Sequence, residues 1–462
     1  MNSDTKNSEP SEFNWQPQPE AAQLLDLILK KCCQKISKLA ALETNLQEQT
    51  GTRLVDWIDH IELPFNDALA SKLLASGFAV DASESGTITT WRHTAGLFPP
   101  MRLGANRNRV ALKVDSIDDF MAAAGRATGE TLPFRWPSPG QYRLIVVYQK
   151  PTIEVCAVER HGYSGFTKVK TEPELIEAAT DHLATFRVRN RRSGTDNHGF
   201  LKASEAIRNA AKEIGTPWAC DLFFRAEREY WQSRNKAARV QYRRQQRLGL
   251  GWANHDHHTY RSSRERFVDL IGVLEELGFE CRERFYAGHE AGWGAQVLEQ
   301  PDSGIVVFAD VDLSPDEVQE DFAHVSLPKR EGLGTVGLWC RLHGEAFLDA
   351  GMHHLECQFD FDKSREQLAG EGVETMVPFT DFPYLKQAFT QGEIWRVAPA
   401  NIDALIQENL ITNEQADEFR NEGALGSHLE ILERNDGYKG FNQTGISDII
   451  TRTDPRQSIN QP

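Results

Sequence analysis

Four kinds of hydrophobic pattern follow one another along the chain. Residues 1–18 are polar, rich in Ser, Asn, Pro and Glu, and predict a disordered tail. From Pro19 to about Gln49 apolar residues recur at steps of three and four, which predicts an amphipathic helix. Residues 50–166 mix short helical patterns with strand-like runs such as RVALKV and YRLIVVYQ, which indicates an α+β region.

Residues 200–250 have a helical pattern with a defined start and stop. Thr216 can cap the main helix, Pro217 suits its first turn and Gly249 can end it. Between Arg225 and Arg247 basic residues far outnumber acidic ones. The pattern favours a solvated connecting helix that pairs with an acidic body, and the alternative is a surface for an anionic partner.

Two similar cycles of strand, helix and three strands come next. In the first cycle NHDHHTYR leads into the helical RERFVDLIGVLEELG and then into FECRERF, AQVLEQP and GIVVFADVDL. In the second, MHHLECQFDFD leads into KSREQLAGEG, ETMVPF, EIWRVA and SHLEILER, with a polar helical pair at Asn401–Gly423 before the last strand. Tandem βαβββ cycles predict a curved mixed sheet around a cavity.

The side chains of a strand alternate between its two faces, and this alternation places the candidate metal ligands. The apolar residues at odd positions from 355 to 361 must face the helix, which leaves His354 and its even-numbered neighbours for the cavity. Leu429 and Ile431 likewise leave Glu430 there. Together with His257 of the first strand, the cavity receives two imidazoles and a carboxylate, a set that suits Fe(II) and oxygen chemistry.

Neighbouring histidines leave two choices open. His353 is the rival of His354, because a shift of one residue in strand register exchanges them. His258 follows His257 on the opposite face, and we expect His258 and His255 beside the ligands or at the surface. A single histidine on a strand is more often a hydrogen-bonded structural residue, so the prediction depends on the three ligands occurring together.

These motifs resemble those of the vicinal oxygen chelate superfamily, nearest to its 2-oxoadipate dioxygenase/decarboxylase family, over about Gly251 to Asp448. The segment HHTYR matches the family's His-x-x-x-Arg, HHLECQFDFD is similar to its second strand, and HLEILER supplies the Glu and Arg of its closing strand. The resemblance implies metal ligation by His257, His354 and Glu430. It also implies catalytic roles for Arg261 and Arg434 and substrate binding by Arg261 and Gln358, the last standing where the family has an arginine.

The resemblance further implies a non-haem Fe(II)-dependent dioxygenase and decarboxylase that acts on a 2-oxo acid or a related small carboxylate, with dioxygen as its second substrate. Arg261 would grip the carboxylate in two contacts. Attack of oxygen on C2 would release carbon dioxide and leave a hydroxylated acid. Similar ligands would also bind Mn, Zn or Ni. A metal-dependent isomerase or lyase of the same superfamily would use a similar set of ligands. The rival from another class is a catalytically inactive ligand-binding module.

A repeat extends this architecture into the N-terminal half. The segment AVERHGYSGF, residues 157–166, echoes LERNDGYKGF, residues 432–441, and predicts a related module there. Its expected first strand, RVALKV, has Val110 and Leu112 where a ligand histidine is needed, so we interpret it as a degenerate module without metal. The shared Gly-Tyr-x-Gly-Phe is interpreted as a structural turn, with a binding role as the alternative.

Composition and charge limit the remaining choices. The 462 residues carry a net charge of −16, which argues against nucleic acid as a partner. The seven cysteines are expected to be reduced thiols, mostly in the core. No apolar run suits a membrane span and the N-terminus lacks a signal core, so a cytoplasmic location is expected. The sequence gives no indication of the oligomeric state.

The predicted organisation is an α+β protein in four parts. A tail at 1–18 precedes an N-terminal α+β domain with the degenerate module at 19–200. A helical connector with the basic helix follows at 201–250. The metal-binding domain, built from the tandem βαβββ modules, spans 251–462.

Overall fold

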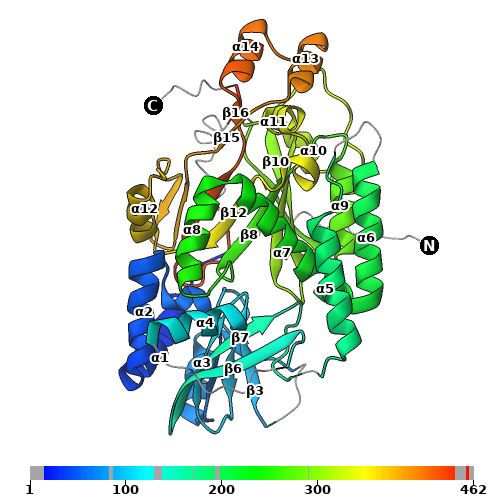
Figure 1. Ribbon diagram of the computed structural model, residues 1–462. Helices are drawn as coiled ribbons and strands as arrows, with labels where there is room; N and C mark the ends of the chain where they lie inside the picture. Colours follow the sequence, from blue (N-terminus) through cyan, green and yellow to red (C-terminus); the bar gives the residue numbers. More distant parts are fainter. Residues whose placement is uncertain are drawn as a thin grey trace, which may run out of the picture.

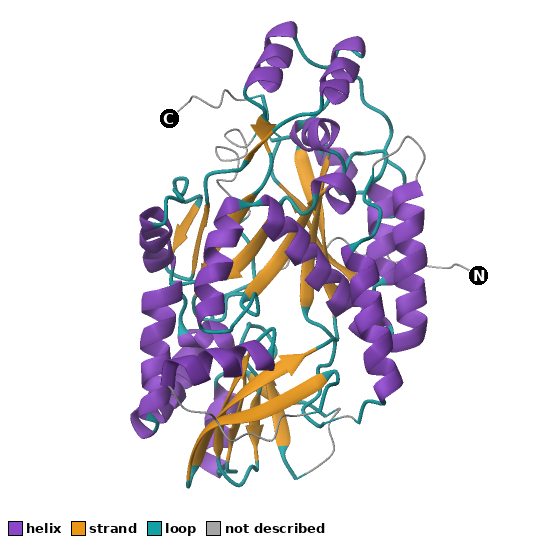
Figure 2. Ribbon diagram, in the orientation of Figure 1, coloured by secondary structure: helices purple, strands orange, loops and turns teal. Residues whose placement is uncertain are grey.

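The computed structural model consists of two mixed β-sheets with helices packed around them (Figures 1 and 2). It describes residues 15–82, 87–128, 138–168, 170–192, 198–289, 291–442 and 454–456. Most of the tail predicted at 1–18 therefore lies outside the described residues. The sheet of the N-terminal half has seven strands and that of the C-terminal half has eight, and they lie one below the other in Figure 1. The α+β prediction is confirmed.

The first C-terminal cycle agrees with its predicted elements. It consists of β8 (His255–Arg261), α9 (Phe267–Glu276), β9 (Glu280–Tyr286), β10 (Trp293–Gln300) and β11 (Ile305–Asp312). The strands lie in the order β8-β11-β10-β9, with β11 parallel to β8. The apolar face of α9 packs on the sheet through Phe267, Leu270, Ile271 and Leu274, all buried.

The second cycle begins and ends as predicted, but two of its strands were misplaced. It consists of β12 (His354–Gln358), α12 (Phe361–Gly370), β13 (Thr380–Phe382), β14 (Leu385–Phe389) and β17 (His428–Arg434). The segment ETMVPF forms only an isolated bridge, at Thr375, and EIWRVA gives β15 (Ile394–Trp395), which pairs with β16 (Ala424–Leu425) in a separate small sheet. The strands β13 and β14 were missed because they are short and flank Pro383 in a tight turn.

The two C-terminal cycles form one sheet because their first strands pair. β12 runs antiparallel to β8 and parallel to β17, which gives the order β13-β14-β17-β12-β8-β11-β10-β9. The first strand of each cycle, β8 and β12, and the last strand of the second cycle, β17, are therefore neighbours at the centre of the sheet. This arrangement pairs Glu356 with His257, 99 positions away, and His354 with His428, 74 positions away.

The N-terminal half contains two related cycles, whereas the repeat predicted one. The first is β1 (Ile58–Leu63), α3 (Asp67–Ala75), β2 (Phe78–Val80), β3 (Thr89–His93) and β4 (Met101–Leu103). The second, one strand shorter, is β5 (Asn108–Lys113), α4 (Ile117–Thr128), β6 (Tyr142–Lys150) and β7 (Ile153–Arg160). Their order is β2-β3-β4-β1-β5-β7-β6, and β1 and β5 pair antiparallel as β8 and β12 do. The predicted first strand is therefore the start of the second cycle.

Two predicted long helices are each broken once. The first becomes α1 (Pro19–Lys35) and α2 (Ser37–Thr50), separated by the extended, buried Ile36. The second becomes α7 (Thr216–Arg234) and α8 (Lys236–Arg247), because extended Asn235 ends one helix and caps the next through Ala238 N. Thr216 lies inside the helix instead of capping it, while Pro217 and Gly249 lie where predicted.

The helical connector is longer than predicted and packs against the C-terminal sheet. It begins with α5 (Pro173–Arg187) and α6 (His198–Ile214), before α7 and α8. In the basic stretch Arg228 and Arg244 are buried, and Arg244 donates to the Gln49 carbonyl and the Gln241 side chain. Arg228 and Arg244 therefore lie inside the protein, whereas the prediction placed this stretch on a solvated surface. The remaining helices are η1 (Leu54–Trp57), α10 (Pro315–Val318), α11 (Thr335–His343), the π-helical η2 (Ala346–Ala350), α13 (Pro399–Gln407) and α14 (Asn413–Asn421).

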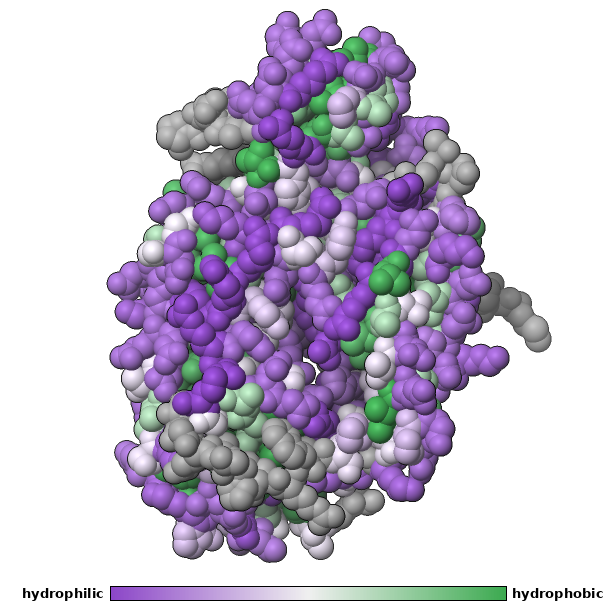
Figure 3. Space-filling view, in the orientation of Figure 1, coloured by the Kyte–Doolittle hydropathy of each residue, from purple (hydrophilic) through white to green (hydrophobic). Residues whose placement is uncertain are grey.

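Polar residues dominate the visible surface of the molecule (Figure 3). The face shown in Figure 3 is mostly hydrophilic, with apolar residues scattered over it. None of the helices that the structure describes combines the length and apolar content that a bilayer crossing requires. All seven cysteines are free thiols, and five of them are buried.

Candidate metal and substrate site

The candidate site is a cavity on the face of the eight-stranded sheet opposite its helices. Leu355, Cys357, Leu429 and Ile431 face the helical core, as their alternation predicted. The cavity has a volume of about 90 Å³, which corresponds to several water molecules at about 10–15 Å³ each and suits a small organic acid. Its polar lining residues are His257, Thr259, Arg261, Asp310, His353, His354, Glu356, Gln387, Glu430 and Asn442.

The structure brings the three predicted metal ligands together in this cavity. One ligand atom from each of His257, His354 and Glu430 lies within 4.8 Å of the other two, and all three residues are buried. His354 Nε2 lies 3.0 Å from Glu430 Oε2. The three residues come from three adjacent strands, β8, β12 and β17, so the sheet pairing itself sets their separation.

A second carboxylate, Glu356, lies beside the three candidate ligands. Its Oε1 is 3.0 Å from His257 Nδ1, and Gln387 Nε2 donates to both Glu356 Oε2 and Glu430 Oε1 at 3.1 Å. Burial and the nearby Glu430 raise the pKa of Glu356 to about 8, and burial also raises that of Glu430. Two buried carboxylates that repel each other next to imidazoles form a donor set that a divalent cation would stabilise.

The two imidazoles differ in protonation. Burial lowers the pKa of His257, but Glu356, Asp256 and Glu430 outweigh it and raise the pKa to about 10. Burial and the neighbouring His257 hold the pKa of His354 well below its usual range, so His354 offers a lone pair. A metal ion bound here would take the place of the His257 proton. The residues present therefore fit a metal with two imidazole ligands and one carboxylate ligand.

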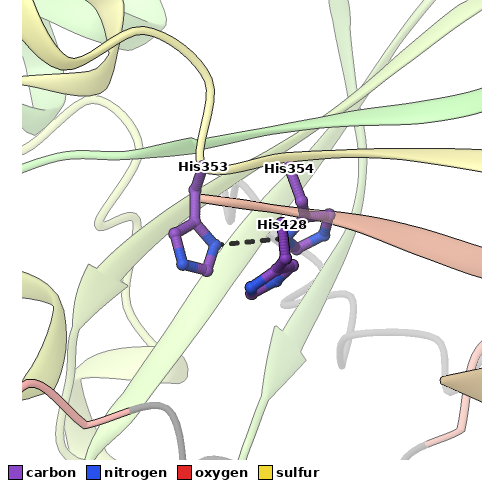
Figure 4. A group of neighbouring side chains, drawn as sticks. All are labelled: His353, His354 and His428. Atoms are coloured by element: carbon purple, nitrogen blue, oxygen red, sulfur yellow. Dashed lines mark hydrogen bonds between the residues drawn. The ribbon is translucent and has the colours of Figure 1, made fainter. Parts of the chain in front are cut away.

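Three histidines meet at one end of this site (Figure 4). His353 Nδ1 and His354 Nδ1 share a hydrogen bond of 3.1 Å, and His428 packs against both rings. The sequence left open whether His353 or His354 faces the cavity. In the structure both residues line it. His354 belongs to two possible metal-binding groups, the one with His257 and Glu430 and the one with His353 and His428.

Arg261 and Asp310 lie at the same end, in register on β8 and β11. Arg261 is 3% exposed, and its Nε and Nη1 have no hydrogen-bond partner. Burial raises the pKa of Asp310 to about 7, against the opposing effect of Arg261. Arg261 is thus a buried cation with free donors inside the cavity, as its predicted role requires. Asp310 was missed, although its alternation with buried Ala309 and Val311 on the same strand could have placed it.

Arg434 and Gln358 do not line the cavity. Arg434 donates from Nε and Nη2 to Asp256, both at 3.0 Å, and from Nη1 to the carbonyl oxygens of Gly440 and Tyr438. Gln358 donates to the same Asp256 at 2.9 Å. Arg434 therefore supports the strand and the loop after it, and the proposal below includes neither the predicted catalytic role of Arg434 nor the predicted substrate binding by Gln358.

The Gly-Tyr-x-Gly-Phe turn contributes to the cavity through its last residue. Phe441 lines the cavity and packs edge-on against His257 with ring centroids 5.7 Å apart. Five further aromatic residues complete an apolar wall, namely Phe285, Trp293, Phe308, Phe379 and Phe389. Four of these lie on strands and Phe379 directly precedes β13, so only the sheet topology brings them together.

His258 lies on the opposite face of β8, as the alternation predicted. It is fully buried, with Nε2 3.3 Å from Arg228 Nη1 and Nδ1 3.3 Å from the Val306 carbonyl. His255 packs beside it at 5.1 Å between ring centroids. Neither residue lines the cavity.

The N-terminal half contains a close copy of the Arg434 contacts. Arg160 donates from Nε and Nη2 to Asp59 at 2.6 and 2.9 Å, and from Nη1 to the carbonyl oxygens of Gly165 and Tyr163. Asp59 and Asp256 both precede a histidine, and Phe166 packs edge-on against His60 as Phe441 does against His257. The repeat in the sequence thus corresponds to a repeated side-chain arrangement.

The metal ligands are replaced in this copy. When the strand registers of the two halves are matched, the three ligand positions of the C-terminal site are occupied by His60, Arg109 and Cys156. Arg109 pairs with Glu62 at 2.7 Å and with Glu154 at 2.7 Å. A guanidinium paired with two carboxylates therefore lies at the position that corresponds to His354. Val110 and Leu112 face the core, on the other side of β5.

No family model and no curated protein matches the sequence. Solved structures with some similarity include methylmalonyl-CoA epimerase from Mycobacterium tuberculosis, at 13% identity over 39% of this chain and 88% of that chain, TM-score 0.23. A mutant 4-hydroxymandelate synthase from Streptomyces coelicolor is 12% identical over 86% of this chain and 98% of that chain, with a TM-score of 0.27. A xylose isomerase-like TIM barrel/4-hydroxyphenylpyruvate dioxygenase fusion protein is 13% identical over 88% of this chain and 52% of that chain, with a TM-score of 0.22. At these scores the similarities establish no function.

Proposed function

We propose that the protein is a non-haem Fe(II)-dependent dioxygenase and decarboxylase of a 2-oxo acid with an apolar side chain. The observation that carries the proposal is the grouping of His257, His354 and Glu430 on one wall of a cavity that also holds the free guanidinium of Arg261. The resemblance of the strand motifs to the 2-oxoadipate dioxygenase/decarboxylase family supports it.

Each part of the cavity has a separate task in this proposal. His257, His354 and Glu430 would hold the metal, and Gln387 would keep Glu430 oriented. Bound Fe(II) supplies the activation of dioxygen. Arg261 binds the substrate carboxylate through its guanidinium N–H groups, of which those on Nε and Nη1 have no partner, and such donors are stronger in this buried site than in water.

The aromatic wall supports an apolar side chain on the substrate. Six aromatic residues line the cavity, and among the described lining residues Arg261 is the one guanidinium or ammonium group. When Arg261 binds one carboxylate, the described lining residues include no second guanidinium or ammonium group that could bind the other carboxylate of a dicarboxylic acid. A hydrocarbon or aromatic side chain would instead displace water from the rings.

The test combines metal content with oxygen uptake. Wild-type protein loaded with Fe(II) under air should consume one dioxygen per carbon dioxide released from a 2-oxo acid and form a hydroxy acid one carbon shorter. A panel of phenylpyruvate, 4-methyl-2-oxopentanoate, 2-oxoglutarate and 2-oxoadipate tests the side-chain preference, and we expect the first two to have the higher kcat/KM. Substitution of any of the three ligands by Ala should abolish metal retention.

The outcomes separate the parts of the proposal. Unchanged metal content in all three ligand variants contradicts the metal site and favours a catalytically inactive binding module. Metal binding without oxygen uptake on any 2-oxo acid contradicts the dioxygenase and favours a metal-dependent isomerase or lyase. A preference for 2-oxoadipate rejects only the apolar side chain.

A further inference from the structure

Several residues beside the metal ligands carry buried polar atoms without hydrogen-bond partners, and three of these residues are Arg261, His353 and Thr259. In these three the atoms are Nε and Nη1 of Arg261, Nε2 of His353 and Oγ1 of Thr259. All three residues line the cavity, and each is at most 3% exposed. Buried donors left without partners are unfavourable and uncommon in folded proteins, so their concentration in one cavity points to a ligand that accepts hydrogen bonds.

The strand pairing holds these residues together. Thr259 and Arg261 share one face of β8, two positions apart. Thr259 pairs with His354 in the register of β8 and β12, and His353 directly precedes β12 and donates its backbone N–H to the Thr259 carbonyl at 2.9 Å. The side chains of Thr259, Arg261 and His353 therefore reach the cavity beside His354.

The hydrogen bond between the two neighbouring histidines fixes which nitrogen of His353 carries the proton (Figure 4). His353 Nδ1 and His354 Nδ1 lie 3.1 Å apart, so one donates and the other accepts. His354 Nε2 faces Glu430 at 3.0 Å and is the nitrogen that the proposed metal would take. The His354 proton must then reside on Nδ1 and be donated to His353. His353 accepts it on Nδ1 and carries its own proton on Nε2.

We propose that His353, Arg261 and Thr259 form a carboxylate subsite in which His353 Nε2–H is a substrate-binding donor oriented by the metal ligand His354. The inference rests on the proposed function and adds two residues to the single arginine that the sequence motif supplied. The ligand is the carboxylate of a 2-oxo acid. Metal and substrate are then linked through one imidazole pair, because metal binding at His354 sets the tautomer that His353 needs.

The same histidines offer a competing arrangement, a metal ion held by His353, His354 and His428. That group contains no carboxylate, and the positive charge of Arg261 acts on both His353 and His428. The charge of Arg261 acts on His354 as well, but Glu430 offsets it in the proposed metal site, whereas the three-histidine group has no carboxylate, so a dication is disfavoured there and an anion is favoured. The charges therefore favour the carboxylate.

Two amide substitutions separate the two nitrogens of His353. His353→Asn keeps an acceptor near the Nδ1 position and removes the Nε2 donor, and His353→Gln keeps an amide donor near Nε2. Binding of pyruvate to the Fe(II)-loaded protein is measured calorimetrically under nitrogen, with methyl pyruvate as the ligand that lacks the carboxylate charge. We expect His353→Asn to retain metal and to bind pyruvate about 10- to 100-fold more weakly.

The controls follow from the same geometry. His353→Gln should recover most of the pyruvate affinity, Thr259→Val should show a smaller loss than His353→Asn, and neither substitution at His353 should change the binding of methyl pyruvate. Normal pyruvate binding by His353→Asn, or an equal loss for the ester, overturns the subsite. So does the absence of pyruvate binding to the wild type.

Metal stoichiometry and oxygen uptake complete the test. A second metal ion per wild-type chain that is lost in His353→Asn overturns the subsite in favour of the three-histidine metal site. Tight, carboxylate-dependent binding of pyruvate that weakens in His353→Asn supports the subsite even if no 2-oxo acid consumes oxygen. In that case the proposed dioxygenase fails and the carboxylate subsite stands.

Discussion

Replacing Arg434 by Met should weaken metal binding without any change in the ligands themselves. Arg434 is 3% exposed at its side chain and makes two hydrogen bonds to Asp256 and two to loop carbonyls. Asp256 directly precedes His257, and the loop carries Phe441, which packs against the His257 ring. Losing the guanidinium leaves Asp256, whose side chain is 10% exposed, without a cation and with Gln358 as its remaining side-chain donor, and it releases both supports of His257.

The magnitude follows from the buried ion pair. Removing one partner of such a pair costs about 3–5 kcal/mol of folding stability. Loss of groups that orient a metal ligand lowers metal affinity by about 10- to 100-fold. Urea unfolding measures the first effect, and titration of the apo-protein with Fe(II) under nitrogen measures the second.

The N-terminal half supplies a matched control. Arg160 makes the same four kinds of contact, to Asp59 and to two loop carbonyls, but next to a site without the metal ligands. Arg160→Met should also destabilise the fold, by somewhat less because its side chain is 22% exposed, and should leave metal affinity unchanged. Equal loss of metal affinity in both variants would mean that general destabilisation causes the effect, and our account of Arg434 would be refuted.

Three further predictions test other parts of the molecule. His257→Ala should lose the metal while His258→Ala retains it, as elemental analysis will show; the opposite result would mean that the other face of β8 binds metal. Arg261→Ala should bind 2-oxo acids about 100-fold more weakly at unchanged metal content, since two charge-assisted hydrogen bonds are lost, and equal losses of both would contradict this role. His161 lies 2.8 Å from both Glu159 and Asp221, whose carboxylates outweigh burial and raise its pKa to about 9. Because the folded pKa is raised, its contribution of about 3 kcal/mol is present below about pH 6.5 and is lost as pH rises through 9. His161→Gln should therefore destabilise at pH 6 and have little effect above pH 9.5 in urea unfolding, and an effect independent of pH would contradict the charged imidazole.

Local pattern was a reliable guide wherever a segment has one buried face. The strands β12 and β17 were predicted because their apolar residues alternate, and that alternation also put His354 and Glu430 on the cavity side. A register error of one residue would have moved every side chain to the other face, so the burial of Leu355 and Leu429 fixed the choice.

Local pattern failed where the backbone depends on distant partners. Ile36 and Asn235 interrupt helices whose apolar periodicity continues across the break. The strands β13 and β14 have too few residues to show a period, and they exist because β17 pairs with β14. Helix breaks and edge strands of this kind are decided by packing against neighbours, which outweighs local propensity.

The sequence by itself determined which residues could bind a metal and which face of each strand they occupy. It did so because alternation along a strand is a property of the backbone alone. Only the tertiary structure decided that Glu356 and Gln387 lie against Glu430 and that Arg434 donates to the carbonyl oxygens of the loop after β17. The same holds for the aromatic wall, whose members come from both cycles. These contacts join residues far apart in the chain, and their distances depend on the order in which the strands pair.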